Sequence, residues 1–231
     1  MIPKIIHQTA PTKDLTIEEQ RLIGRNKALL PGWEFYLHDD ADNLRIMREA
    51  FPQFADAFQY IKRGVVQSDI ARCVYLHHFG GWYMDTDYKI IKPLDAGLLE
   101  HPLILPVSGT ERDRHLVCNS VMASERGHPF WREFLTHIFS GETLSDLDEK
   151  HVEATTGPLG LSKFYLANRE RFPDIYLPPK PMFHPRVTLR GFSYERFPES
   201  YGIHWCWGSW RTKSFPRAVK NFVTRKVTSY F

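Results

Sequence analysis

The sequence predicts an α/β domain with a mixed, mainly parallel central sheet flanked by helices. Short apolar or aromatic runs alternate with segments of helical periodicity, as in residues 4–8, 17–30 and 33–38. Polar residues directly follow several of these runs. Strands that alternate with helices form parallel sheets, and ligands bind at the edge where such strands end. With 231 residues and 42% hydrophobic content, the chain can build one large domain or two small ones.

The N-terminal segment predicts a strand, a helix and a second strand. Residues 4–8 are an apolar run after Pro3 and predict a buried first strand. A helix is expected over residues 17–30, where the Pro31-Gly32 turn signal ends it. Residues 33–38 tend to alternate between apolar and polar side chains and are rich in aromatic ones, a pattern typical of a strand.

Three further helices follow in the first third of the chain. Asp39-Asp40 caps a helix that we expect to reach about Ala50, and Pro52 opens a short one. Residues 67–79 have the strongest helical pattern, because their apolar side chains share one face. Gly80-Gly81 ends this helix.

Shorter patterns fill the rest of the chain. Residues 82–91 predict one continuous strand. Thr156-Gly157-Pro158 starts a helix that runs to about Asn168, and residues 142–148 are interpreted as a solvated acidic surface. We also expect a helix at residues 129–139 and short strands at 103–107, 120–123, 175–177 and 182–184.

Composition excludes several classes of protein. No apolar run approaches the roughly 18 residues of a membrane-spanning helix, and the N-terminus lacks a signal-peptide core. The cysteines Cys73, Cys118 and Cys206 are odd in number and widely spaced. They fit neither a disulfide framework nor a zinc motif, so we expect reduced thiols in a cytoplasmic protein.

Asp85 and Asp87 are the main candidate site, at the end of the aromatic run Trp82-Tyr83-Met84. In a strand, residues i and i+2 point the same way, so the two carboxylates should converge. Converging carboxylates are costly unless a cation or several donors satisfy them. Their oxygens suit Mg²⁺ or Mn²⁺, and such an ion would bind a diphosphate. The alternative is two solvated acids in a loop.

Asp69 and Arg72 are a second candidate pair. They lie three residues apart on a predicted helix and therefore share a face. One interpretation is an exposed ion pair, which would contribute little to stability. The other interpretation is a functional pair, because the helix leads directly into the acidic strand. A carboxylate and a guanidinium held there would bind sugar hydroxyls through charge-assisted hydrogen bonds.

Together these motifs resemble a known family. The run Ser68-Asp69-Ile70-Ala71-Arg72, then Gly80-Gly81, then Tyr83-x-Asp85-x-Asp87 resembles the sugar-binding region that contains the DXD motif. Family 32 glycosyltransferases share this region, including the yeast initiation α-mannosyltransferase and bacterial capsular polysaccharide transferases; clostridial glucosylating toxins share it more distantly. Matching segments lie at residues 2–8, 33–38 and 65–95, with weaker ones at 119, 156–158 and 204–210.

The resemblance implies a GT-A-type, Rossmann-like fold and a retaining hexosyltransferase that uses a nucleotide-diphosphate sugar with Mn²⁺ or Mg²⁺. Asp87 would coordinate the metal directly, and Asp85 would contact the nucleotide ribose and the metal. Asp69 and Arg72 would hold the donor sugar, completing the implied catalytic set. Because the motif is shared with users of UDP-sugars, UDP-hexose is favoured as the donor, with GDP-mannose as the alternative.

Further donor contacts are implied near the start and middle of the chain. His7 and Gln8 end the first strand, where the nucleotide base of GT-A enzymes lies, although backbone contacts would suffice there. Ser68 belongs to the matched motif. Asn119 would bond the donor sugar, or else it is simply a turn residue.

The segment 204–210 contains three tryptophans in seven residues. It resembles the lid that closes over the diphosphate in the related toxins. His204 would then be a further metal ligand, and Trp210 would contact the donor. The alternative is a hydrophobic plug, with His204 a packed or surface residue.

Residues 211–231 form a tail that we separate from a glycosyltransferase domain at residues 1–210. The tail contains six basic residues and no acidic one, whereas the whole chain has a net charge of +3. Its apolar residues have partly helical spacing, so it predicts either a basic amphipathic helix at an anionic membrane surface or a helix packed on the domain. Peripheral binding to the inner face of a membrane would follow from the first. Nucleic-acid binding is disfavoured, because the aromatics are not arranged as in a binding sheet.

The predicted function is transfer of a hexose to a glycan or lipid-linked saccharide. One alternative is a toxin-like transferase that modifies a protein side chain. Another is a catalytically inactive sugar-binding protein, which the intact set of Asp69, Arg72, Asp85 and Asp87 disfavours. A metal-dependent phosphohydrolase would need more His and Asp ligands than this cluster offers.

Overall fold

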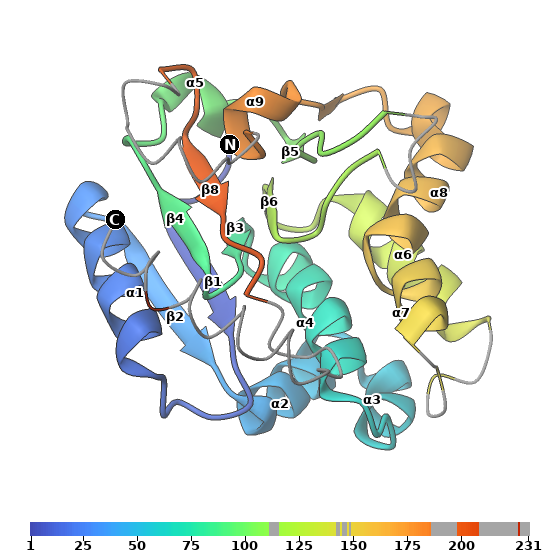
Figure 1. Cartoon of the computed structure of the whole chain (residues 1–231). Coiled ribbons are helices and arrows are strands. Elements are labelled where there is room, and N and C mark those ends of the chain that lie inside the picture. Colours follow the sequence, from blue (N-terminus) through green and yellow to red (C-terminus); the bar gives the residue numbers. More distant parts are fainter. Residues whose placement is uncertain are drawn as a thin grey trace.

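A six-stranded sheet forms the centre of the protein, with strand order β2-β1-β3-β6-β5-β7 (Figure 1). The computed structural model describes residues 1–110, 116–141, 144, 147, 149–185, 198–207 and 226. In this sheet β6 alone runs antiparallel to its neighbours, so the expected mixed, mainly parallel sheet is confirmed. Its strands are β1 (Ile5–Thr9), β2 (Glu34–His38), β3 (Gly81–Met84), β5 (Leu103–Ile104), β6 (Val121–Ser124) and β7 (Ile175–Tyr176).

Four helices of the first half begin and end close to where the sequence predicts them, whereas the short helix at Ala96–Leu99 was not predicted. Asp39 caps α2 as expected, with its side chain accepting a hydrogen bond from the Asp42 N–H. The strongest predicted helix begins three residues earlier than expected, at Gly64. These helices are α1 (Ile17–Leu29), α2 (Asp40–Ala50), α3 (Pro52–Gln59), α4 (Gly64–His78) and α5 (Ala96–Leu99).

In the second half, two of the helices were predicted and two were not. The segments expected at residues 129–139 and 158–168 are α6 and α8. The strand predicted at residues 182–184 is wrong, because Met182 lies in a helix whose first turn contains Pro181. The helices are α6 (Pro129–Phe139), α7 (Glu149–Thr155), α8 (Pro158–Asn168) and α9 (Lys180–Phe183), with a 3-10 turn at Arg169–Arg171.

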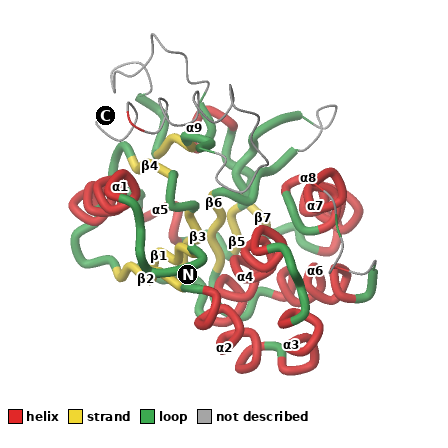
Figure 2. The backbone as a smooth tube through the Cα atoms, turned by 60° about the horizontal axis from the view of Figure 1, so that its bottom comes forward, coloured by secondary structure: helices red, strands yellow, loops and turns green. Residues whose placement is uncertain are grey.

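The sheet separates two apolar cores, as strand alternation requires. Tyr83 packs with helices α2, α4, α6 and α8 on one face. Its neighbours Trp82 and Met84 pack on the opposite face with β4 (Tyr88–Ile90), α5 and α9. Figure 2 shows α2, α4 and α6 grouped on one side of the strands and β4 and α9 on the other. Within the described part of the chain, no helix is long and apolar enough to cross a membrane.

The Gly80-Gly81 pair brings α4 and β3 together. Both residues have positive φ, +72° and +93°, a region that favours glycine. A Cβ on Gly81 would lie 2.7 Å from the Ile5 carbonyl oxygen in β1. The pair therefore permits a close approach of β3 to β1 as well as ending the helix.

The strand predicted at residues 82–91 is two strands in different sheets, which corrects the sequence prediction. A turn closed by the hydrogen bond from the Tyr88 N–H to the Asp85 carbonyl separates β3 from β4. β4 then pairs antiparallel with β8 (Gly202–His204), which was not predicted as a strand. This small second sheet brings the C-terminal region to the acidic motif.

Candidate active site

The acidic motif lies in the turn between β3 and β4, at the carboxyl end of a central strand. In the antiparallel pair of β4 and β8, His204 lies opposite Tyr88, the residue that directly follows the motif. The Trp205 N–H donates to the Asp87 carbonyl (3.2 Å), and the Trp207 N–H donates to Asp87 Oδ2 (2.7 Å). Pairing of β8 with β4, together with these two hydrogen bonds just after β8, therefore fixes the imidazole beside the carboxylates.

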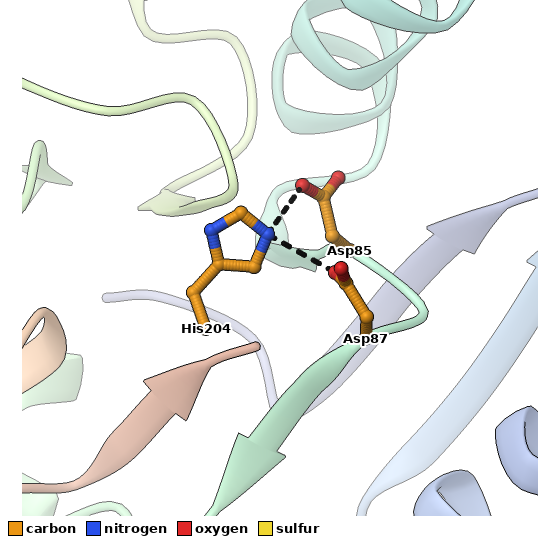
Figure 3. Close-up of side chains that lie close together, drawn as sticks. All are labelled: Asp85, Asp87 and His204. Atoms are coloured by element: carbon orange, nitrogen blue, oxygen red, sulfur yellow. Dashed lines mark ion pairs between the residues drawn. The ribbon is translucent and has the colours of Figure 1, made fainter. Parts of the chain in front are cut away.

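Asp85, Asp87 and His204 converge on one point (Figure 3). The His204 Nε2 lies 3.0 Å from Asp87 Oδ1 and 3.5 Å from Asp85 Oδ2. One ligand atom from each residue lies within 4.8 Å of the others. Two carboxylates and an imidazole at this spacing fit a divalent cation.

Electrostatics in the cluster favour an ion pair between Asp87 and His204. Burial opposes protonation of His204, but the charge of Asp87 outweighs it and raises the pKa of His204 well above its usual value. Burial likewise disfavours the charged form of Asp87, but His204 and the Trp207 N–H lower the pKa of Asp87 below its usual value. Burial raises the pKa of Asp85, against the charges of Arg72 and His204.

Asp69 and Arg72 form a buried pair beside this cluster, rather than an exposed one. Their side chains are only 6% and 8% exposed, and Arg72 Nη2 lies 3.1 Å from Asp69 Oδ1. Arg72 Nη1 also donates to the Asn119 carbonyl (2.6 Å) and lies 3.4 Å from Asp85 Oδ1. The Asn119 side-chain amide donates to Asp69 Oδ1 (2.9 Å). Arg72 thus connects the two predicted acidic groups.

Three contacts of the motif residues were not assigned from the sequence. Tyr83 donates from its hydroxyl to Asp85 Oδ1 (2.7 Å), and the Arg72 guanidinium lies over its ring at 4.6 Å. The i, i+2 spacing of Tyr83 and Asp85 was the available signal. Thr86 donates to Glu19 of α1 (3.3 Å), a contact that no local pattern indicates.

Of the remaining predicted site residues, some contact the acidic motif or Arg72 and others do not. Gln8 is buried and donates to the Asp85 carbonyl (3.3 Å). His7 is also buried, but it bonds to His38 Nε2 (3.0 Å) and the Gly80 carbonyl (3.1 Å), away from the carboxylates. Ser68 is half-buried, and its carbonyl accepts from Arg72 Nε (3.2 Å). Trp210 lies outside the described residues.

Fold and site together define a GT-A domain with an acidic cluster at the carboxyl edge of its sheet. Residues 16–104 match the model of the family described as "Glycosyltransferase sugar-binding region containing DXD motif". This match confirms the predicted resemblance for this part of the chain.

Curated relatives extend the similarity beyond the family model. Mannosyl phosphorylinositol ceramide synthase SUR1 of Saccharomyces cerevisiae is 34% identical over 164 residues, which are 70% of this chain and 41% of that protein. Inositol phosphoceramide mannosyltransferase 2 of Schizosaccharomyces pombe is 28% identical over 210 residues, 91% of this chain and 58% of that protein. The chain thus spans about half the length of the curated relatives it matches.

A solved structure supports the fold. The PaToxG glycosyltransferase aligns with a TM-score of 0.57 at 19% identity, covering 74% of this chain and 70% of that one. The predicted GT-A fold is therefore confirmed.

Proposed function

We propose that this protein is a metal-dependent, retaining glycosyltransferase that moves a hexose from a nucleotide-diphosphate sugar to a lipid-linked acceptor. The convergence of Asp85, Asp87 and His204 beside the Asp69–Arg72 pair is the observation that supports it most directly. It joins groups suited to a divalent ion with groups suited to sugar hydroxyls.

Mannose is the sugar we propose. Both curated relatives named above are called mannosyl or mannosyltransferase enzymes, and both names include an inositol ceramide lipid. By this similarity we favour GDP-mannose over UDP-hexose as the donor, and a phosphoinositol-bearing lipid as the acceptor.

Asp85, Asp87 and His204 would hold the metal ion, which would replace the proton that His204 carries in its ion pair with Asp87. When bound, the ion would offset the charge of the diphosphate and stabilise the negative charge that develops on the leaving group. Mg²⁺ takes mainly oxygen ligands, so the imidazole of His204 favours Mn²⁺. Asp69 and Arg72 would hold the donor sugar, while Tyr83 and Arg72 fix the carboxylate of Asp85.

Incubation of the purified protein with GDP- and UDP-sugars tests the proposal. Each donor would be supplied with Mn²⁺, with Mg²⁺ or with EDTA, and released nucleoside diphosphate would be measured. We expect release from GDP-mannose that requires Mn²⁺ and increases when inositol phosphoceramide vesicles are added. Metal-independent release would contradict the role of the cluster. Failure to bind any nucleotide sugar would contradict the function as a whole.

A further inference from the structure

Thr156 is a buried residue that the sequence indicated as the start of a helix, within a segment that weakly matches the family. It is 1% exposed and lies between α7 and α8. Its hydroxyl oxygen is 3.1 Å from Asp69 Oδ2 and 3.4 Å from the Val152 carbonyl oxygen. A hydroxyl has one hydrogen to donate. The carboxylate is both the nearer and the charged acceptor, so the Thr156 hydroxyl donates its hydrogen bond to Asp69.

The two oxygens of Asp69 have different partners. Oδ1 accepts a hydrogen bond from Asn119 Nδ2 (2.9 Å) and forms an ion pair with Arg72 Nη2 (3.1 Å). Among the described residues, the hydrogen bond to Oδ2 comes from Thr156. A carboxylate oxygen accepts about two hydrogen bonds. Oδ1 is therefore engaged by two partners, whereas Oδ2, with Thr156, retains acceptor capacity for a ligand hydroxyl.

The position of Thr156 is itself closely constrained. A Cβ on Gly157 would lie 2.9 Å from Glu153 Cα, and one on Gly160 would lie 2.3 Å from the Thr155 carbonyl oxygen. Helices α7 and α8 approach this closely because glycine occupies both positions. Such packing leaves the hydroxyl of Thr156 little freedom to move away from Asp69.

Helix α8 also holds the segment that supplies Asn119. The Ser162 hydroxyl oxygen accepts from the N–H groups of Leu116 (3.0 Å) and Val117 (3.1 Å). Thr156 and Asn119 reach Asp69 from elements that Ser162 ties together. The carboxylate plane of Asp69 is thus fixed at both of its oxygens.

We propose that Thr156 is a positioning residue for the donor sugar. Its hydroxyl holds the Asp69 carboxylate so that Oδ2 accepts a hydrogen bond from a sugar hydroxyl. The inference rests on the proposed function and adds a residue to it. Thr156 touches the carboxylate, and the carboxylate touches the sugar.

Thr156→Val removes the donor at nearly constant volume, and Thr156→Ser keeps it. Thr136→Val is the matched control, because the Thr136 hydroxyl is exposed and donates to the Arg132 carbonyl within α6. Release of nucleoside diphosphate from GDP-mannose would give kcat and KM. The affinity for GDP alone with Mn²⁺ would be measured separately. We expect kcat/KM of Thr156→Val to fall by about 10²-fold, as for a displaced positioning group, with GDP affinity unchanged and Thr156→Ser close to wild type.

A double-mutant cycle separates positioning from a general structural role. In an Asp69→Asn background, Thr156→Val should cause no further loss of kcat/KM.

Should the valine variant be recovered unfolded, Thr156→Cys replaces it, because a thiol is a weak donor of similar size. Equal losses of GDP and GDP-mannose affinity, or no rescue by serine, would overturn the inference. So would Thr156→Val with wild-type turnover, whereas a wild-type protein that binds no donor would overturn the proposed function itself.

Discussion

Single residues in this site are stabilised by partners from distant parts of the chain. Asp87 is the clearest case, because its carboxylate meets His204 at 3.0 Å and the Trp207 N–H at 2.7 Å. Its side chain is nevertheless 13% exposed, so a ligand can reach it. Asp69 is more enclosed and depends on Arg72, Asn119 and Thr156. This difference matches a metal ligand in the first case and a directional sugar contact in the second.

The first prediction concerns Asp87. Asp87→Asn should lower the Mn²⁺-dependent affinity for GDP by roughly 100-fold or more, since loss of an outer partner of a metal ligand already costs about 10–100-fold. Titration calorimetry with Mn²⁺ and with EDTA would measure the change. Asp56→Asn, at an exposed position of α3, is the control. An unchanged Mn²⁺ dependence would remove Asp87 from the metal site.

A second prediction follows from two buried histidines. Burial lowers the pKa of His7 to about 3 and that of His38 to about 4, from 6.5. Above pH 6.5 the two histidines are neutral in both the folded and the unfolded protein. As the pH falls below 6.5 the unfolded chain takes up protons that the folded one does not. The free energy of unfolding should therefore decrease, by up to about 1.4 kcal/mol per pH unit for each histidine.

Urea unfolding at pH 7.5, 6 and 5 would measure this dependence. His38→Gln should make the decrease shallower, because one of the two groups is removed. His101→Gln is the control, since His101 is only half-buried and stacks on Tyr176. Equal slopes for wild type and His38→Gln would contradict the assignment of a neutral buried His38.

At the level of elements, local patterns predicted most of the first half of the fold. Asp39 and Pro52 mark helix starts through hydrogen bonds and backbone angles confined to a few residues, and both predictions are confirmed. The strand predicted at residues 82–91 was wrong because apolar residues lie on both sides of the turn at Asp85, so the pattern alone does not show that two strands meet there. Only pairing with β8, distant in sequence, separates β4 from β3. The acidic pair Asp85 and Asp87 was predictable from the local sequence, but the contact of Asp87 with the distant Trp207 was not.

A third prediction tests the approach of β3 to β1. Gly81→Ala should destabilise the protein by roughly 1–3 kcal/mol, because alanine is strained at positive φ and its Cβ would meet the Ile5 carbonyl. Gly24→Ala is the matched control. A Cβ on Gly24, in α1, would meet no neighbouring element within 4 Å, so alanine should stabilise by about 0.5–1 kcal/mol. Chemical denaturation would compare the two, and equal effects would refute the close approach.

For the whole molecule, the charge distribution separates the tail from the rest. The six basic residues of 211–231 remain a predicted membrane-binding segment. Most of this segment lies outside the described residues, but Lys226 forms an ion pair with the buried Glu18 of α1. The tail therefore has at least one contact with the domain, which the alternative of a packed helix requires.

A fourth prediction concerns this tail. Deleting residues 220–231 removes three basic side chains, each worth about 1 kcal/mol at an anionic surface. Cosedimentation with vesicles containing phosphatidylserine should therefore decrease, while vesicles of neutral lipid show no difference. An unfolding midpoint for the shortened protein would verify that loss of Lys226 leaves the domain folded. Undiminished binding to anionic vesicles would favour the packed-helix alternative.

The pairing of β4 with β8 also sets an order of events during synthesis. Asp87 and Trp207 lie 120 residues apart. At about 5–20 residues per second, the acidic motif leaves the ribosome on the order of ten seconds before the residues that complete its surroundings. A growing chain would therefore expose the Asp87 carboxylate without its His204 and Trp207 partners for that interval. Competence to bind the ion would arise only after Trp207 has been synthesised, so that a chain truncated before this residue would not retain metal or nucleotide.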